Sequence, residues 1–378
     1  MKSALFKKEG GQEGHEQKKK RGLGHRPRRG SGQQPRIAAT STRLCQAKEA
    51  FVSAAFIFLR TTFLEGLRTY WTLVRLMIPV MIGVKVLVEL GLLPVLARLA
   101  APVMQVAGLP AETGLVWASA LLVNLYGGAV VLLALLPTMP LTACQATVIG
   151  LMMLMAHAIP LEQSIARRAG VAFVFSALLR VGGAFAAGAL FALVCQSLGW
   201  LQGPAPVLLT AMSGSGVQQG AWDVWALDSL RSLAMILGIV ISLVFLLRVL
   251  DRLGVTARLT RMLSPVLGRV GIGGRAMPLT MVGVLLGLSY GGALIIREAQ
   301  AGSIPRRQVF LAVCLLSLTH SLIEDTLFVM ALGAHWMGIV VWRVAFTLAV
   351  IWCLDRLLDR LPEPVSERVF YAGSSSKT

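Results

Sequence analysis

The chain has 378 residues, of which 56% are hydrophobic and only 14% are charged, and its mean hydropathy is +0.71. Soluble domains carry about 25% charged residues, so this composition excludes an ordinary soluble enzyme, and it excludes disorder over most of the length. Several apolar runs are long enough to cross a bilayer, and they lack the alternation of β-barrel strands. We therefore expect an all-α polytopic membrane protein.

The net charge of +18 is partly local to residues 1–50, where basic residues are interleaved with Gly, Gln and Pro. Such a segment cannot bury a core, so we expect a disordered basic cytoplasmic tail held near anionic lipid. In a soluble protein this charge would suggest nucleic acid. Here the expected partner is the lipid bilayer, with no nucleic acid.

The first half of the chain contains four apolar segments after a mixed lead-in. Residues 51–70 combine Phe with Arg and Glu, which predicts an amphipathic lead-in helix at the membrane interface. Residues 70–93, 141–158 and 171–198 are long enough to predict spans. Residues 113–137 form a further apolar segment with Tyr-Gly-Gly near its middle.

The second half begins after a polar stretch. Residues 201–230 contain no Lys or Arg and carry a pair of Trp residues, which predicts an external loop. A charged cytoplasmic tail over residues 357–378 is expected to close the chain. Between them, four apolar segments occupy residues 231–253, 276–296, 307–323 and 336–354.

The second half of the chain repeats the first at one constant offset, which equals the separation in sequence of His157 from His320 and which we call the repeat spacing. Compositional bias would match leucines, but it does not explain matching Pro, Gly, His and Arg at one offset. We therefore predict two repeats, over residues 71–200 and 231–356. The matching pairs include Pro102 and Pro265, Gly108 and Gly271, His157 and His320, and Arg180 and Arg343.

Charge decides how the two repeats are oriented, because Lys and Arg collect in cytoplasmic loops. If every segment spanned, Arg167, Arg168 and the basic residues of 252–275 would face outside. If residues 113–137 instead enter and return on one side as a re-entrant helical hairpin, every charged loop obeys the rule. Each repeat then has three transmembrane helices plus a hairpin, and this odd number makes the copies inverted, as in many secondary transporters.

The hairpin tips are the first candidate binding site. Glycines allow a tight reversal and a close approach of ligand to backbone, and a returning half-helix points its N-terminal amides at the tip. Close helix packing is the alternative role for these glycines. The candidate substrate-binding residues here are Asn124, Tyr126, Gly127, Gly128, Ser289, Tyr290, Gly291 and Gly292.

Two stations of His and acidic residues form the second candidate site. Ionisable groups inside a membrane segment are costly and usually functional. At the repeat spacing, one acid of the first station aligns with Asp325 of the second. The candidate substrate-binding residues are His157, Glu162, His320, Glu324 and Asp325.

The helix geometry around these stations differs between the copies. Pro160 is expected to break the helix between His157 and Glu162. In a straight helix, His320 and Glu324 would share one face.

Two arginines are candidate partners for the carboxylates of these His and acidic stations. Arg180 and Arg343 fall inside apolar segments, and a buried arginine needs an acid partner, for which the station acids are the nearest candidates. Alternatively, Glu162 sits at a helix end and is neutralised by Arg167 or Arg168.

The motifs Tyr-Gly-Gly-Ala, His-Ala-Ile-Pro-Leu-Glu and His-Ser-Leu-Ile-Glu-Asp-Thr resemble the nucleoside-recognition, or gate, domain family of bacterial membrane proteins. Spore maturation proteins A and B belong to it, and the gate halves of the ferrous iron transporter B are similar. The resemblance covers about residues 70–356. It implies three spans and a hairpin per repeat in a bacterial inner membrane, with a small solute carried between hairpin tips and broken helices.

We therefore expect a transporter-like protein that moves a small polar solute, such as a nucleoside, by alternating access. The alternatives are an ion or metal permease that uses the His and acid residues as ligands, and a non-transporting membrane assembly or signalling factor. No P-loop, zincin or nucleophile-elbow motif is present. We assign no enzyme activity, no cofactor and no resident metal, while a coupling ion and a homo-oligomer stay open as partners.

Overall fold

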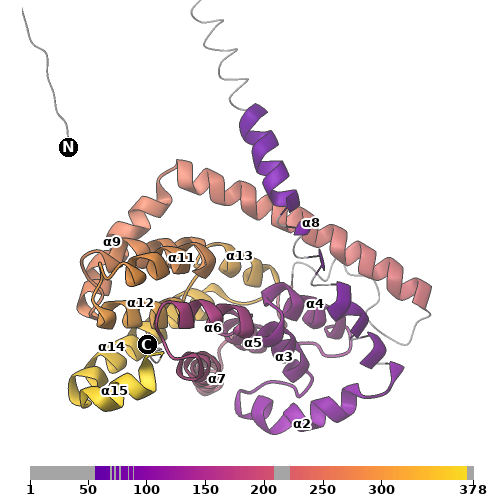
Figure 1. Cartoon of the computed structure of the whole chain (residues 1–378). Coiled ribbons are helices and arrows are strands. Elements are labelled where there is room, and N and C mark those ends of the chain that lie inside the picture. Colours follow the sequence, from indigo (N-terminus) through magenta and orange to yellow (C-terminus); the bar gives the residue numbers. More distant parts are fainter. Residues whose placement is uncertain are drawn as a thin grey trace, which may run out of the picture. The chain divides into compact units, whose positions relative to one another are not determined.

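The computed structural model describes residues 56–207, apart from residues 69, 72–73, 76–77, 84 and 88, and residues 222–372. This part of the chain is built from helices, and extended pairing within it is limited to two isolated bridges (Figure 1). The all-α prediction is confirmed. The predicted basic tail lies outside the described residues.

Four helical stretches in the described chain are long and apolar enough to cross a bilayer, so the chain is a membrane protein. They coincide with four of the six predicted spans. Of the other two, residues 70–93 are described only in part, and residues 307–323 contain the 13-residue helix α12 (Arg306–Leu318). The four stretches are Ala143–Arg168, Phe173–Ser197, Trp222–Leu250 and Met337–Arg360.

Each half of the chain contains a pair of short apolar helices packed against each other. After α2 (Leu93–Val106), α3 (Thr113–Leu122) is followed by α4 (Leu125–Leu135), and the later pair is α10 (Ala276–Leu286) and α11 (Leu288–Gln300). The chain breaks just before Tyr-Gly-Gly rather than at it, so these residues form the first turn of the returning helix. Re-entry into the membrane stays a prediction.

Two further helices are interrupted at matching places. The first is divided into α5 (Ala143–Met155) and α6 (Ile159–Arg168), and the second into α12 and α13 (Glu324–Ala331). Ala158 and Ser321, which are separated by the repeat spacing, have φ of 46° and 48°.

The interruptions bear on two predictions. The first break precedes Pro160, which lies at the start of α6, because the helix has already ended at Met155. A face shared by His320 and Glu324 would require a straight second helix, but this helix ends at Leu318 although its break contains no proline. Both histidines therefore lie inside the interruptions.

The helices α5 and α12 occupy the interior of the fold. After the first turn, nearly every residue of both helices is buried. They contact each other and are flanked by α7 (Phe173–Ser197) and by α14 (Arg343–Arg360), which follows the π-helical turn η2 (Met337–Trp342). The ends of α5 and α12, and hence the two histidines, are placed in the core.

The long helix α8 (Trp222–Arg252) begins earlier than predicted, and a turn at Gly254 joins it to α9 (Val255–Arg269) (Figure 1). Residues 222–230 are therefore helical rather than part of the predicted external loop, whose centre lies outside the described residues. The acidic Asp223 in the first turn favours this helix start. Within the predicted lead-in, residues 56–68 are helical, and Glu65 pairs there with Arg248 of α8.

Residues 357–372, predicted as tail, are structured. The helix α14 continues to Arg360, and α15 (Glu363–Phe370) follows it. The Phe370 ring is buried, with its centroid 4.8 Å from that of Phe175, and its carbonyl accepts a 2.8 Å hydrogen bond from the Ala172 N–H. Burial of this aromatic side chain outweighs the charged composition of the segment.

Candidate functional site

The interruptions of the two broken helices bring His157 and His320 together. Their Nε2 atoms lie 3.4 Å apart, and the ring centroids are 5.1 Å apart. Both side chains are buried. The two predicted stations, far apart in the chain, thus meet at one place, which we call the central His pair.

Both imidazoles are oriented by the same backbone contact. The Nδ1 of His157 lies 2.9 Å from the Met153 carbonyl, and the Nδ1 of His320 lies 2.8 Å from the Leu316 carbonyl. A carbonyl oxygen only accepts, so both Nδ1 atoms carry the hydrogen. In the neutral ring, the Nε2 lone pair is then free and points toward the partner histidine.

Buried carboxylates border the central His pair. Glu162 Oε1 lies 3.2 Å from His157 Nε2 and 3.4 Å from His320 Nε2. A carboxylate oxygen of Asp325 lies within 4.8 Å of one ring nitrogen of each histidine. Glu162 and Asp325, which align at the repeat spacing, thus both belong to the centre.

A straight helix would place Glu324 on one face with His320, and the structure does not have this arrangement. Because α12 ends at Leu318 and α13 begins at Glu324, no continuous turn connects the two residues. Glu324 is half-buried, whereas the adjacent Asp325 is buried and faces the histidines.

Two arginines with fully buried side chains lie next to the central His pair and its carboxylates. Arg180 bonds Glu162 Oε2 through Nη1, and its Nε donates to the Met155 carbonyl at 3.0 Å. This is the predicted acid–arginine pairing, and it excludes Arg167 and Arg168 as the main counter-ions of Glu162. The guanidinium also holds the carboxylate with its other oxygen toward the histidines.

Arg343 was also expected to pair with an acid, but it binds backbone instead. Its Nε donates to Leu318 O at 3.2 Å, and its Nη2 donates to Leu154 O at 3.1 Å and to His320 O at 3.0 Å. Helix ends leave carbonyls unpaired, so the breaks themselves supply these acceptors. Among the described residues, Arg180 Nη2 and Arg343 Nη1 are buried donors without a hydrogen-bond partner.

The hairpin residues have mainly structural contacts. The Asn124 side chain accepts a 2.8 Å hydrogen bond from the Gly127 N–H and so caps α4. Tyr126 is buried, with its ring 4.5 Å from that of Phe328.

The glycines after the breaks lie where the two arms of each pair touch. A Cβ on Gly128 would lie 2.7 Å from the Ala120 Cβ, and a Cβ on Gly291 would overlap the Gly283 backbone. Gly292 is buried, and the side chains of Ser289 and Tyr290 lie outside those described. The packing alternative therefore accounts for Gly128 and Gly291.

The first arm of each helix pair is tied to one interruption. The Ala158 N–H donates to Ala120 O at 2.9 Å, and the Leu322 N–H donates to Val284 O at 2.8 Å. A displacement of either hairpin would therefore move the adjacent break and its histidine.

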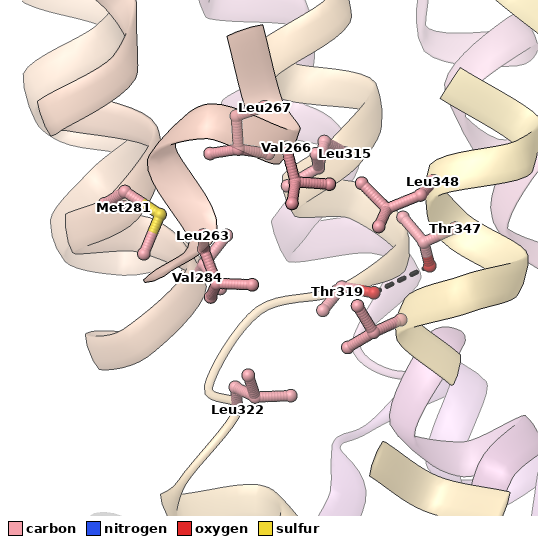
Figure 2. Close-up of a pocket in the computed structure, with 11 residues that line it drawn as sticks. Leu263, Val266, Leu267, Met281, Val284, Leu315, Thr319, Leu322, Thr347 and Leu348 are labelled. Atoms are coloured by element: carbon pink, nitrogen blue, oxygen red, sulfur yellow. Dashed lines mark hydrogen bonds between the residues drawn. The ribbon is translucent and has the colours of Figure 1, made fainter. Parts of the chain in front are cut away.

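A small, largely apolar pocket adjoins the second interruption (Figure 2). At its wall, the hydroxyls of Thr319 and Thr347 are hydrogen-bonded at 2.7 Å. The sequence analysis did not identify this pair. The feature that could have indicated it is that Thr347 lies one helical turn after Arg343. The remaining lining is apolar and comprises Leu263, Val266, Leu267, Met281, Val284, Leu315, Leu322, Val344 and Leu348.

Comparison with curated proteins finds a bacterial relative. The chain is 26% identical over 290 residues to a protein of Bacillus subtilis (strain 168) named uncharacterized membrane protein YvoD, covering 76% of this chain and 89% of that protein. No family model and no solved structure matches the chain. The similarity agrees with the apolar helices in identifying a membrane protein.

Proposed function

We propose that this chain is an inner-membrane carrier that moves a small polar solute by alternating access, with the central His pair at its binding site. The observation that carries the proposal is that equivalent residues of the two halves, His157 and His320, meet at 3.4 Å. In carriers built from inverted repeats, equivalent points of the copies meet near the bilayer midplane at the repeat interface.

The backbone supports a repeated architecture. Four pairs of residues separated by the repeat spacing share positive φ: Gly91 and Gly254, Gly108 and Gly271, Ala158 and Ser321, and Gly170 and Gly333. The two arginines also repeat one contact, since Arg180 and Arg343 donate through Nε to the equivalent carbonyls of Met155 and Leu318. The charge distribution favours inversion of the copies.

The chemistry of the centre favours a polar solute. Arg180 Nη2 and Arg343 Nη1 are buried donors without partners among the described residues, and leaving such donors unpaired is costly. A solute with hydrogen-bond acceptors would satisfy them. The resemblance to gate domains suggests a nucleoside, which would require the closely packed centre to open.

An ion or metal permease is the second candidate. It is favoured by the close grouping of His157, His320 and Asp325, whose ligand atoms lie within 4.8 Å of one another. This spacing suits an ion without rearrangement of the fold.

Uptake by proteoliposomes tests the proposal. We expect the purified chain to accumulate one class from a panel of nucleosides and divalent cations, and His157→Gln or His320→Gln to abolish this uptake. His335→Gln is the matched control, because His335 contacts Trp200 away from the centre. Failure of the reconstituted wild-type chain to transport any panel member would contradict the proposal and favour the assembly-factor alternative.

A further inference from the structure

The central His pair has the geometry of a partial metal coordination shell. Three electron-rich atoms, His157 Nε2, His320 Nε2 and Glu162 Oε1, form a triangle with sides of 3.2, 3.4 and 3.4 Å. Zinc binds nitrogen and oxygen at about 2.0–2.1 Å with tetrahedral angles, which places its ligand atoms about 3.3–3.4 Å apart. The triangle therefore matches one face of a zinc tetrahedron.

The surroundings of the triangle keep its atoms available as ligands. Each histidine directs its Nδ1–H to a backbone carbonyl, Met153 for one ring and Leu316 for the other. This second contact is typical of metal-ligating histidines, because it fixes the tautomer that leaves Nε2 free. Arg180 likewise holds Glu162 by Oε2 and leaves Oε1 directed at the rings.

Asp325 supplies a candidate fourth ligand. Its carboxylate lies within 4.8 Å of one ring nitrogen of each histidine, and the side chain is buried. It occupies the position in the second half that Glu162 occupies in the first, so each half contributes one histidine and one acid to the centre. Without a cation, the free lone pairs of this set repel one another.

We infer that this centre binds a divalent first-row transition-metal ion through His157, His320 and Glu162, with Asp325 completing the shell. The inference rests on the ion or metal permease, the second candidate function, and deepens it, since it names the class of ion bound at the same centre. Imidazole nitrogen selects such ions over Mg²⁺ and Ca²⁺, which require oxygen ligands. A proton bound to one imidazole would relieve the same repulsion. The experiment described below distinguishes a bound proton from a bound metal ion.

The charges around the centre suit reversible binding. Glu162 and Asp325 attract a dication, whereas the buried guanidinium groups of Arg180 and Arg343 oppose it. A transported ion must bind strongly enough to enter but weakly enough to leave. We therefore expect weaker affinity than that of a closed structural zinc site, whose ligands are free of nearby positive charge.

Equilibrium titration of Zn²⁺ into the purified full-length chain tests the inference. We expect one ion per chain, no competition from Mg²⁺, and affinity reduced about tenfold or more in His157→Gln and in His320→Gln. The matched control His335→Gln should bind as the wild type does. Equal affinity in all four proteins would overturn the assignment, because binding would then lie elsewhere, for example in the His residues of the tail.

Zinc-edge X-ray absorption of the wild-type chain keeps the inference testable if the variants do not fold. We expect two imidazole nitrogens and one or two carboxylate oxygens at about 2.0–2.1 Å. An absent imidazole signature, or no bound zinc, would overturn it. Binding is measured without transport, so zinc binding without uptake of any solute refutes only the carrier proposal, whereas nucleoside uptake by a chain that binds no zinc refutes only the metal assignment.

Discussion

Glu162→Ala is expected to lower the free energy of unfolding by about 3–5 kcal/mol, because it leaves the buried Arg180 guanidinium without its counter-ion. Thermal unfolding of the purified chain in detergent measures the loss. Glu65→Ala is the matched control. It also removes a carboxylate bonded to arginine, but the Glu65–Arg248 pair is exposed to a large extent and should contribute about 0–1 kcal/mol.

A double variant separates the charge from the packing in this prediction. Glu162→Gln combined with Arg180→Met removes both charges and should be more stable than Glu162→Ala, since no buried ion is left unpaired. If Glu162→Ala and Glu65→Ala lowered the unfolding temperature equally, the buried Glu162–Arg180 pair would contribute no more to stability than the exposed Glu65–Arg248 pair.

Gly291→Ala is expected to destabilise the chain by about 1–3 kcal/mol, because its new methyl group would overlap the backbone of Gly283 in the facing arm. Gly182→Ala is the control. Gly182 lies within α7, and an added Cβ there meets no atom within 4 Å. This control should be neutral or slightly stabilised, because alanine favours helix more than glycine does.

The same unfolding assay compares the two alanine variants. If Gly291→Ala were as stable as Gly182→Ala, close contact between α10 and α11 would not be needed. The glycines of the hairpin would then be available for the ligand-binding role first expected of them.

Periodicity, composition and spacing were enough to predict much of the fold. Long apolar runs predicted helices, and the repeat spacing paired His157 with His320 before any contact was known. The need of a buried arginine for a counter-ion likewise predicted the Arg180–Glu162 pair. These inferences succeed because the free-energy cost of burying a polar or charged side chain depends mainly on the residue type and little on the details of packing.

The interruption of the second broken helix could not be predicted from local sequence. The first copy has Pro160, but the equivalent position in the second copy is Ile323, which does not stop a helix. The break there is made by tertiary contacts: the Leu322 N–H bonds Val284 O, and Arg343 takes the freed Leu318 carbonyl. Helix propensity therefore does not predict the break that positions His320.

The ends of the helices were also set by aromatic contacts, local in one case and between distant segments in the other. Residues 222–230 and 357–372 are polar enough to suggest loop or tail. Nevertheless, Trp222 and Trp225 pack edge to face in α8, and Phe370 is buried against Phe175 and Phe310. A few aromatic contacts outweigh local polarity, and those of Phe370 become visible only when the partner helices are placed.

Labelling of Ser321→Cys from both sides of sealed membranes tests alternating access at the central His pair most directly. Ser321 lies in the second interruption next to His320, and the change to cysteine is nearly isosteric. The native cysteines are first replaced by serine, and Ser366→Cys in α15 serves as a control for a single side. Alternating access predicts that an impermeant thiol reagent modifies Ser321→Cys in both right-side-out and inside-out vesicles, while Ser366→Cys reacts in only one. Modification of Ser321→Cys from one side alone, or from neither, would contradict the account.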